Sequence, residues 1–259
     1  MGGGVWMQRV IRAGDVEEKY RFFAAANAKP RGKRRQKCSP RKQDVNEFEA
    51  VKRLARLLNC NFRHRDSMIT LTWDGPSIAE LGDPADVDQA RAIAERVVDK
   101  FIERLRYHLR KAGKKLDSYV SVVADINGDT GEIVRPHAHL VLPASVLTMR
   151  DGHLYAGKAD LEKLWGRGGI NLRTLHDQPD LTPIAVYLMR QVRRQPDKAK
   201  YKAARGMRQP VIVDEEIVSN TREIQAPKGA RVLYRSAYEP GKPQYIRYEM
   251  PRKRGGKRE

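Results

Sequence analysis

The sequence predicts an α+β protein in which antiparallel strands pack against amphipathic helices. Short runs of β-branched and apolar residues, such as MITLTW at 68–73, have the two-residue alternation of strands. Two further runs, at 119–125 and 134–142, are joined by a sequence with the turn chemistry of a hairpin. A long segment at 86–111 has the three- and four-residue apolar spacing of a helix.

The composition indicates a folded and strongly basic protein. The 259 residues include 51 Lys and Arg against 32 Asp and Glu, which gives a formal net charge of +19. Hydrophobic residues make up 40% of the chain, which is too many for a disordered polycation. Such a charge attracts nucleic acid most strongly, because closely spaced phosphates release the most counterions on binding.

Cysteine usage and apolar runs indicate a cytoplasmic protein. Cys38 and Cys60 are far apart and lack CxxC spacing, so neither a disulfide framework nor a cysteine zinc site is expected. The beginning of the sequence lacks the apolar core of a signal peptide. No apolar run is long enough to span a membrane, and no membrane partner is expected.

Basic segments flank the predicted folded domain. Residues 28–42, AKPRGKRRQKCSPRK, contain no acid and are typical of an extended arm, either a solvated linker or one that touches phosphates. The chain after Val213 has several Pro and Gly and ends in RKRGGKRE. We therefore expect a basic extension at 1–42, a folded domain at 43–213 and a second basic extension at 214–259.

The elements of the folded domain are expected in the following order. A first helix buries one apolar face, formed by Phe48, Val51, Leu54, Leu57 and Leu58. The strand at 68–73 ends at an Asp-Gly-Pro turn, and the helix at 86–111 stops before Gly113. After the hairpin come a helix at 159–165, a short strand INLRTL and a helix that opens at Thr182.

Two histidines on a predicted strand form a candidate metal site. His137 and His139 are one residue apart, so both imidazoles leave the same face of the strand. Asp125 ends the preceding strand, and closure of the hairpin can bring its carboxylate toward them. Two nitrogens and one oxygen suit either an oxygen-activating iron or an ion for phosphoryl transfer, and the net charge favours the second. The alternative is one surface histidine and one packed histidine.

The helix that opens at Thr182 carries a candidate nucleophile. Its apolar residues are available for burial, while Tyr187, Arg190, Gln191 and Arg194 fall on another face. A phenol is a weak nucleophile at neutral pH, but cationic neighbours and a metal-polarised phosphate favour its phenolate. The alternative is a surface tyrosine that packs beside arginines.

Three motifs, in order along the chain, resemble those of the HUH endonucleases. MITLTW is similar to the FLTLT motif, RPHAHLVL to the His-hydrophobe-His motif and VYLMRQ to the tyrosine motif. The flanking sequences LEKLWGRGGINLRTL and KAARGMRQP resemble replication-associated proteins of phages and plasmids that replicate by rolling circle. The similarity covers residues 8–213.

The resemblance implies a ferredoxin-like core with a central antiparallel sheet, flanked by helices, that presents the histidines opposite the tyrosine. It implies that His137 and His139 bind Mn²⁺ or Mg²⁺. Asp125 takes the place of the acidic third ligand, although relatives often have Glu there, and Glu132 is the alternative. In this reading Tyr187 attacks a phosphate of single-stranded or hairpin origin DNA. The products are a 5′-phosphotyrosine and a free 3′-hydroxyl, and strands are later rejoined without ATP.

The resemblance also implies supporting residues and partners. Arg190 stands where relatives have a lysine, and Gln191 where some have a second tyrosine, so a single-tyrosine enzyme is expected. Tyr201 is the reserve nucleophile. Residues expected to contact DNA are Thr70, Thr72, Arg194 and Arg205.

Other assignments stay open at this stage. No GxxxxGK[ST] motif is present, so a host helicase and polymerase would be partners. The sequence does not determine the oligomeric state. The alternatives are a relaxase or transposase of the same superfamily, and a non-catalytic basic nucleic-acid-binding protein with structural histidines.

Overall fold

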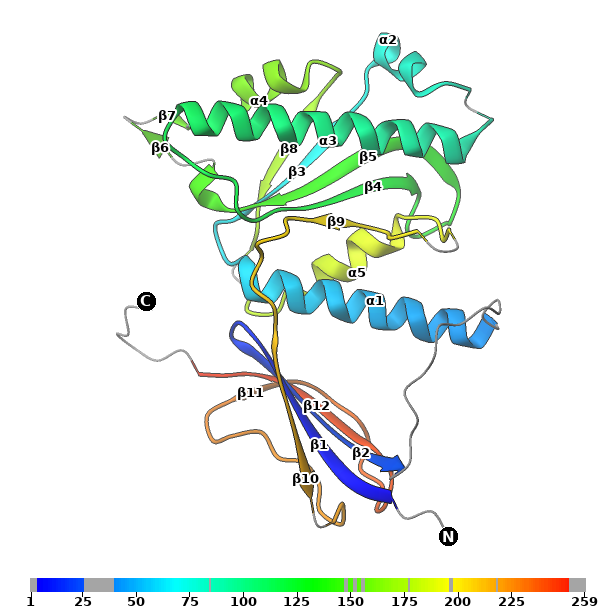
Figure 1. The fold of residues 1–259 in the computed structure, drawn as a ribbon, viewed down its shortest axis with the longest axis vertical. Helices are drawn as coiled ribbons and strands as arrows, with labels where there is room; N and C mark the ends of the chain where they lie inside the picture. The colour runs from blue at the N-terminus through cyan, green and yellow to red at the C-terminus, as the bar shows by residue number, and fades with distance from the viewer. Residues whose placement is uncertain are drawn as a thin grey trace. The chain divides into compact units, whose positions relative to one another are not determined.

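A computed structural model describes residues 4–25, 40–83, 85–146, 149–150, 153–154, 157–176, 178–195, 198–217 and 219–251. These residues form an α+β protein with two five-stranded antiparallel sheets and five α-helices, which confirms the predicted class (Figure 1). The chain divides into two compact units, which we name for their places in the sequence. The terminal unit contains Met1–Cys60, Pro179–Thr182 and Arg208–Glu259, and the central unit contains Asn61–Gln178 and Pro183–Met207.

The central unit is built on a sheet whose neighbouring strands are all antiparallel. In spatial order its strands are β8 (Ile170–Thr174), β3 (Ser67–Thr72), β5 (Ile133–Leu142), β4 (Val120–Ile126) and β9 (Lys202–Ala203). A separate short hairpin pairs β6 (Met149–Arg150) with β7 (His153–Leu154). The strands predicted from MITLTW, YVSVVAD, VRPHAHLVL and INLRTL are therefore confirmed to within two residues at each end.

The helices of this unit lie on both faces of its sheet. They are α2 (Gly75–Ile78), α3 (Val87–Lys111), α4 (Lys158–Trp165) and α5 (Thr182–Arg190), with single 3₁₀ turns at Ala79–Leu81 and Ala144–Val146. Figure 1 shows α3 along one face and α5 on the other. Asp86 caps α3 by accepting the Gln89 N–H. No helix in the described part of the chain combines the length and apolarity that crossing a membrane requires.

Alternation along the strands decides which side chains face which helix. Ile69 and Leu71 of β3 and Ala138 and Leu140 of β5 are fully buried in the hydrophobic core that also contains the apolar stripe of α3. Because successive side chains point to opposite faces, the residues between them must face the side of α5. The core pattern thereby places both histidines on the α5 side.

The terminal unit contains the second sheet. In spatial order its strands are β10 (Val211–Ile217), β1 (Gly4–Ala13), β2 (Val16–Ala25), β12 (Gln244–Glu249) and β11 (Arg231–Arg235). The unit also includes nearly all of α1 (Pro40–Asn61). Arg56 of α1 forms an ion pair with Glu18 of β2 at 2.8 Å, so the helix is joined to this sheet.

This sheet corrects the expectation of irregular basic extensions at 1–42 and 214–259. Strands occupy 4–25, and three more strands follow Val211. Composition alone did not indicate these strands because they are rich in charged residues. Several of these charges pair across strands, as Arg9 does with Asp214 at 2.7 Å. Most of the predicted arm, 26–39, and the end of the chain, 252–259, lie outside the described residues.

One core residue expected on the first helix is exposed. Leu54, Leu57 and Leu58 are buried as predicted, but Phe48 is 60% exposed. The Lys52 ammonium lies 4.4 Å from the centre of the Phe48 ring, so a cation–π contact takes the place of burial.

Candidate active site

The two histidines lie on β5, in the middle of the central-unit sheet. His139 is opposite Thr70 of β3, and His137 is opposite Thr72. Only 2% of the His139 surface is exposed, and His137 is half-buried. Their rings meet edge to face with centres 4.9 Å apart. The two imidazoles therefore lie on the same face of β5, as the strand alternation predicted.

The side-chain amide of Gln191 lies between the two imidazoles. Its Oε1 is 3.2 Å from His137 Nε2 and 3.3 Å from His139 Nε2. Its Nε2 donates to the Tyr187 carbonyl oxygen at 3.2 Å, which fixes the oxygen as the atom that faces the histidines. Sequence reasoning missed this residue, although four-residue spacing places Gln191 beside Tyr187 on one helix face.

The outer ring nitrogens of the histidines have partners of their own. His139 Nδ1 is 3.0 Å from Thr70 Oγ1, and His137 Nδ1 is 3.3 Å from the Arg135 carbonyl oxygen. Thr72 Oγ1 instead donates to the Gly169 carbonyl oxygen at 3.2 Å. Both threonines expected to contact DNA thus hydrogen-bond within the protein, and Thr70 orients an imidazole.

These contacts test whether the residues fit a divalent cation. A neutral His137 has one ring proton, yet both of its ring nitrogens face acceptor oxygens, on Arg135 and Gln191. A cation among the two Nε2 atoms and Oε1 would satisfy all three lone pairs. Their spacing of 3.2 and 3.3 Å is near the about 3 Å between adjacent ligands around an octahedral ion with bonds of about 2.1 Å. The group therefore fits such an ion.

The environment of His139 keeps its imidazole neutral. Burial, and to a lesser extent the nearby His137, lower the pKa of His139 to about 4, although the hydrogen bond with Gln191 opposes the shift. At neutral pH the ring therefore has an unprotonated nitrogen, which is the form that binds metals.

This shift predicts a pH-dependent stability. Between about pH 6.5 and about pH 4 the unfolded chain protonates His139 and the folded chain does not, so the free energy of unfolding falls as pH falls through this window. The expected loss from this group is about 3 kcal/mol. Urea unfolding across the window should show a smaller loss for His139→Gln than for wild type. The control His108→Gln should keep the wild-type loss, and equal pH slopes for wild type and His139→Gln would contradict the prediction.

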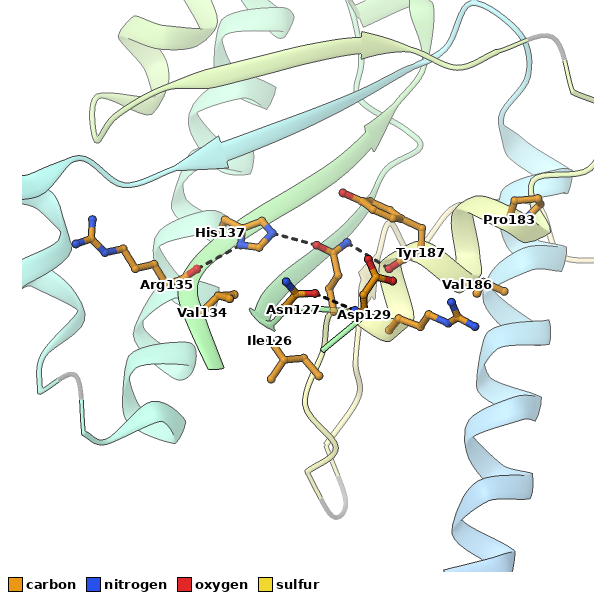
Figure 2. Close-up of a pocket in the computed structure, with 12 residues that line it drawn as sticks. Ile126, Asn127, Asp129, Val134, Arg135, His137, Pro183, Val186 and Tyr187 are labelled. Atoms are coloured by element: carbon orange, nitrogen blue, oxygen red, sulfur yellow. Dashed lines mark hydrogen bonds between the residues drawn. The ribbon is translucent and has the colours of Figure 1, made fainter. Parts of the chain in front are cut away.

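The phenol of Tyr187 lies next to this group. Tyr187 is on α5, is 47% exposed, and its ring centre lies 5.4 Å from that of His139. Figure 2 shows its side chain extending from α5 toward the strand of His137. Tyr187 and His137 line an open pocket of about 510 Å³, together with Arg190, Gln191 and the turn after β4.

That turn closes one wall of the pocket. Asn127 accepts the N–H groups of Asp129 and Thr130, and Gly131 has a φ of 75°. A Cβ at Gly128 would lie 3.3 Å from the Arg190 Cβ, so a glycine is what lets the turn approach the end of α5. Arg190 is thereby placed at the pocket wall.

The structure places Asp125 apart from the histidines. Val122 and Ala124 are the β4 residues opposite the two histidines, and a bulge follows Ala124. Asp125 is fully buried, with Oδ2 3.8 Å from Arg91 Nη1 of α3 and 3.5 Å from Arg193 Nε. The Gln191 amide, and not this carboxylate, is the third group beside the imidazoles.

Asp125 instead anchors the segment that carries Gln191. Its backbone N–H and that of Ile126 both donate to the Gln191 carbonyl oxygen, at 3.0 and 3.1 Å. Its Oδ1 accepts the Arg193 backbone N–H at 2.8 Å, and Arg91 donates to the Arg193 carbonyl oxygen at 3.1 Å. Strand β4 and helix α3 together therefore hold the residues that follow α5.

The remaining expected site residues lie outside the pocket. Glu132 is exposed and accepts from the Thr130 hydroxyl at 3.0 Å, and within the described ranges no three His, Cys, Asp or Glu side chains form a metal-binding group. Arg194 and Arg205 are exposed. Tyr201 lines a different pocket, beside Lys198, Lys200 and Lys202.

Comparison with protein families, with curated proteins and with solved structures finds no match for this chain. A functional assignment therefore depends on the residues and their geometry. The geometry brings together His137, His139, Tyr187 and Arg190 as predicted from the sequence, and adds Gln191.

Proposed function

We propose that the protein is a metal-dependent nickase and strand transferase for single-stranded DNA that initiates rolling-circle replication of a plasmid, phage or integrated element. The observation that carries the proposal is the exposed Tyr187 phenol beside two imidazoles that share one amide oxygen. If the histidines only stabilised the fold, nothing would require a half-exposed phenol beside them in an open pocket lined by two arginines.

The fold supports this assignment. Apart from the short helix α2 and the β6–β7 hairpin, the chain order from β3 to β8 is strand, helix, strand, strand, helix, strand, and the four strands lie in the order β8-β3-β5-β4. A ferredoxin-like fold has the same order of elements and strands, which supports the proposal. This order puts the histidine strand at the middle of the sheet, where neighbours on both sides fix its side chains.

Each residue has a role in the proposed reaction. His137, His139 and Gln191 would hold Mn²⁺ or Mg²⁺, and the bound ion would polarise a phosphate of the DNA. Tyr187 Oη attacks the phosphorus and loses its proton, while the bond to the 3′ oxygen breaks and that oxygen gains a proton. Arg190 lies at the pocket wall, where its charge favours the phenolate and the pentavalent phosphate.

The products explain why a covalent route is useful. The phosphotyrosine keeps the energy of the phosphodiester bond, so the strand can later be rejoined without ATP. The free 3′-hydroxyl primes synthesis by a host polymerase in the cytoplasm, and a host helicase separates the strands.

The proposal is tested by incubating the full chain with a random pool of single-stranded oligonucleotides and Mn²⁺. Intact-mass spectrometry should detect protein that is heavier by a DNA fragment and stable to denaturant. Peptide mapping should find the fragment on Tyr187. DNA binding without any adduct, with Mn²⁺ or Mg²⁺, would contradict the proposal and leave a non-catalytic binding protein.

The role of Gln191 gives a separate prediction. Gln191→Ala removes the oxygen between the imidazoles and should weaken Mn²⁺ binding at least about tenfold in calorimetric titration. Gln191→Glu supplies an oxygen with a charge and should bind Mn²⁺ at least as tightly as wild type. Gln195→Ala, outside the pocket, is the control. Unchanged Mn²⁺ affinity in Gln191→Ala would show that the amide is no ligand.

A further inference from the structure

A second basic surface lies on the outer side of α3. Its groove, of about 670 Å³, is lined by Lys100, Glu103, Arg104, Tyr107, His108 and Lys111 of α3 and by Leu164 of α4. None of these residues lines the Tyr187 pocket. The core residues of α3 face the sheet on the side opposite the histidines, so this groove and the Tyr187 pocket open on different faces of the central unit.

The cations of the groove form a row along the helix. Lys100, Arg104, His108 and Lys111 follow one another at four- and three-residue spacing, so they share one face. With a rise of about 1.5 Å per residue, the row is about 17 Å long. The lining contains three permanent cations and one carboxylate, Glu103, so it has a positive net charge even when His108 is left out of the count.

Among the residues that the structure describes, no carboxylate forms an ion pair with Arg104. Its Nε donates to the Leu164 carbonyl oxygen at 3.0 Å, and its buried Nη2 has no hydrogen-bond partner among the described residues. Burial lowers the pKa of Arg104, and the charge of Arg167 lowers it further. Arg167 forms an ion pair with Glu80 at 2.9 Å, so the partly desolvated guanidinium of Arg104 is the group that makes this end of the groove attractive to an anion.

The aromatic content of the groove indicates which polyanion fits. Unpaired bases bind proteins largely by stacking on free aromatic faces. The Tyr107 ring already has Lys111 at 4.7 Å and Arg110 at 5.5 Å from its centre. Duplex DNA needs no such platform, because its bases are stacked internally and its outer surface presents phosphates.

We propose that the α3 groove is a binding surface for the phosphate backbone of duplex DNA, separate from the pocket that takes a single strand. In an initiator, such a surface would hold the double-stranded part of the DNA while the single strand enters the Tyr187 pocket. The proposed contact is to phosphates, which carry no sequence information directly.

The test is a charge reversal, Lys100→Glu with Lys111→Glu. The control, Arg222→Glu with Lys228→Glu, makes the same change in net charge on exposed residues of the terminal unit. Fluorescence anisotropy would measure the affinity of each full-length protein for a random-sequence duplex and for a single strand over a range of salt concentrations, without divalent cation. Circular dichroism would verify folding, and Lys100→Gln with Lys111→Gln provides a milder version.

We expect the groove variant to bind the duplex at least about tenfold more weakly than the control, with a salt slope smaller by about 2. Its affinity for the single strand should match that of the control. Equal duplex affinities of groove variant and control would overturn the proposal, because net charge alone would then account for binding. A loss confined to the single strand would overturn it too. These outcomes do not depend on whether Tyr187 forms an adduct.

Discussion

Replacing Tyr187 with phenylalanine should abolish the proposed covalent protein–DNA product while DNA binding is nearly unchanged. The substitution removes one oxygen, on a side chain that is 47% exposed, and keeps the ring contact with His139. Without the phenolic oxygen no phosphotyrosine can form at this position, so the expected loss is complete rather than partial. Intact-mass spectrometry with the random oligonucleotide pool and Mn²⁺ measures the adduct, and anisotropy measures binding.

Tyr201→Phe is the matched control. It removes a phenol in a pocket beside three lysines, away from the histidines, and should leave adduct formation intact. An adduct that survives in Tyr187→Phe and disappears in Tyr201→Phe would move the nucleophile to Tyr201. The proposed geometry would then be wrong.

Asp125→Ala should destabilise the protein by about 3 to 5 kcal/mol in urea unfolding. The substitution leaves the buried Arg91 with only the partly exposed Glu95, at 3.1 Å, as a counter-charge, and it removes the acceptor of the Arg193 N–H. Asp99→Ala is the control, because Asp99 pairs with Lys202 at the surface and such a pair contributes at most about 1 kcal/mol.

The same variant separates an anchor from a ligand. If Asp125 were a metal ligand, as its place at the end of a strand led us to expect, Asp125→Ala would abolish Mn²⁺ binding with little loss of stability in the metal-free protein. The structure predicts instead a large loss of stability in the metal-free protein and a smaller effect on Mn²⁺ binding, since the carboxylate holds the backbone that follows Gln191. Asp125→Asn keeps an acceptor oxygen for the Arg193 N–H and should lie between wild type and Asp125→Ala in stability.

Local patterns were sufficient for the central unit. Strands β3, β4, β5 and β8 each have clear alternation or turn signals, and α3 has a continuous apolar stripe, so these elements follow from their own sequences, whereas α2, β6, β7 and β9 were not predicted. The sheet of the terminal unit was missed because its strands are mixed in charge and because two of its pairings, β1 with β10 and β2 with β12, join segments far apart in the sequence. Trp6 pairs with Ile217, and no local period indicates a partner so far along the chain.

The site divides in the same way. The shared face of His137 and His139 follows from the two-residue period, because neither residue can turn to the other face without moving the hydrophobic set of β5 out of the core. The side on which Asp125 lies depends on how β4 pairs with β5: Ala124 is opposite His137, so alternation directs Asp125 to the other face, toward α3. The four-residue spacing places Gln191 beside Tyr187 at the end of the helix. Its contact with the imidazoles depends on the position of β5 in the folded protein, which the sequence does not give.

By itself, the sequence determined the four long strands of the central unit, the helices α3 and α4, the common face of the histidines and the helix that carries Tyr187. Periodicity encodes these features residue by residue, and hydrophobic burial enforces them. Only the tertiary structure decided that Gln191 rather than Asp125 joins the imidazoles, that Asp125 binds arginines, and that both ends of the chain form one sheet. These outcomes depend on which distant segments meet, because hydrogen bonds and ion pairs between them form only after the backbone has closed.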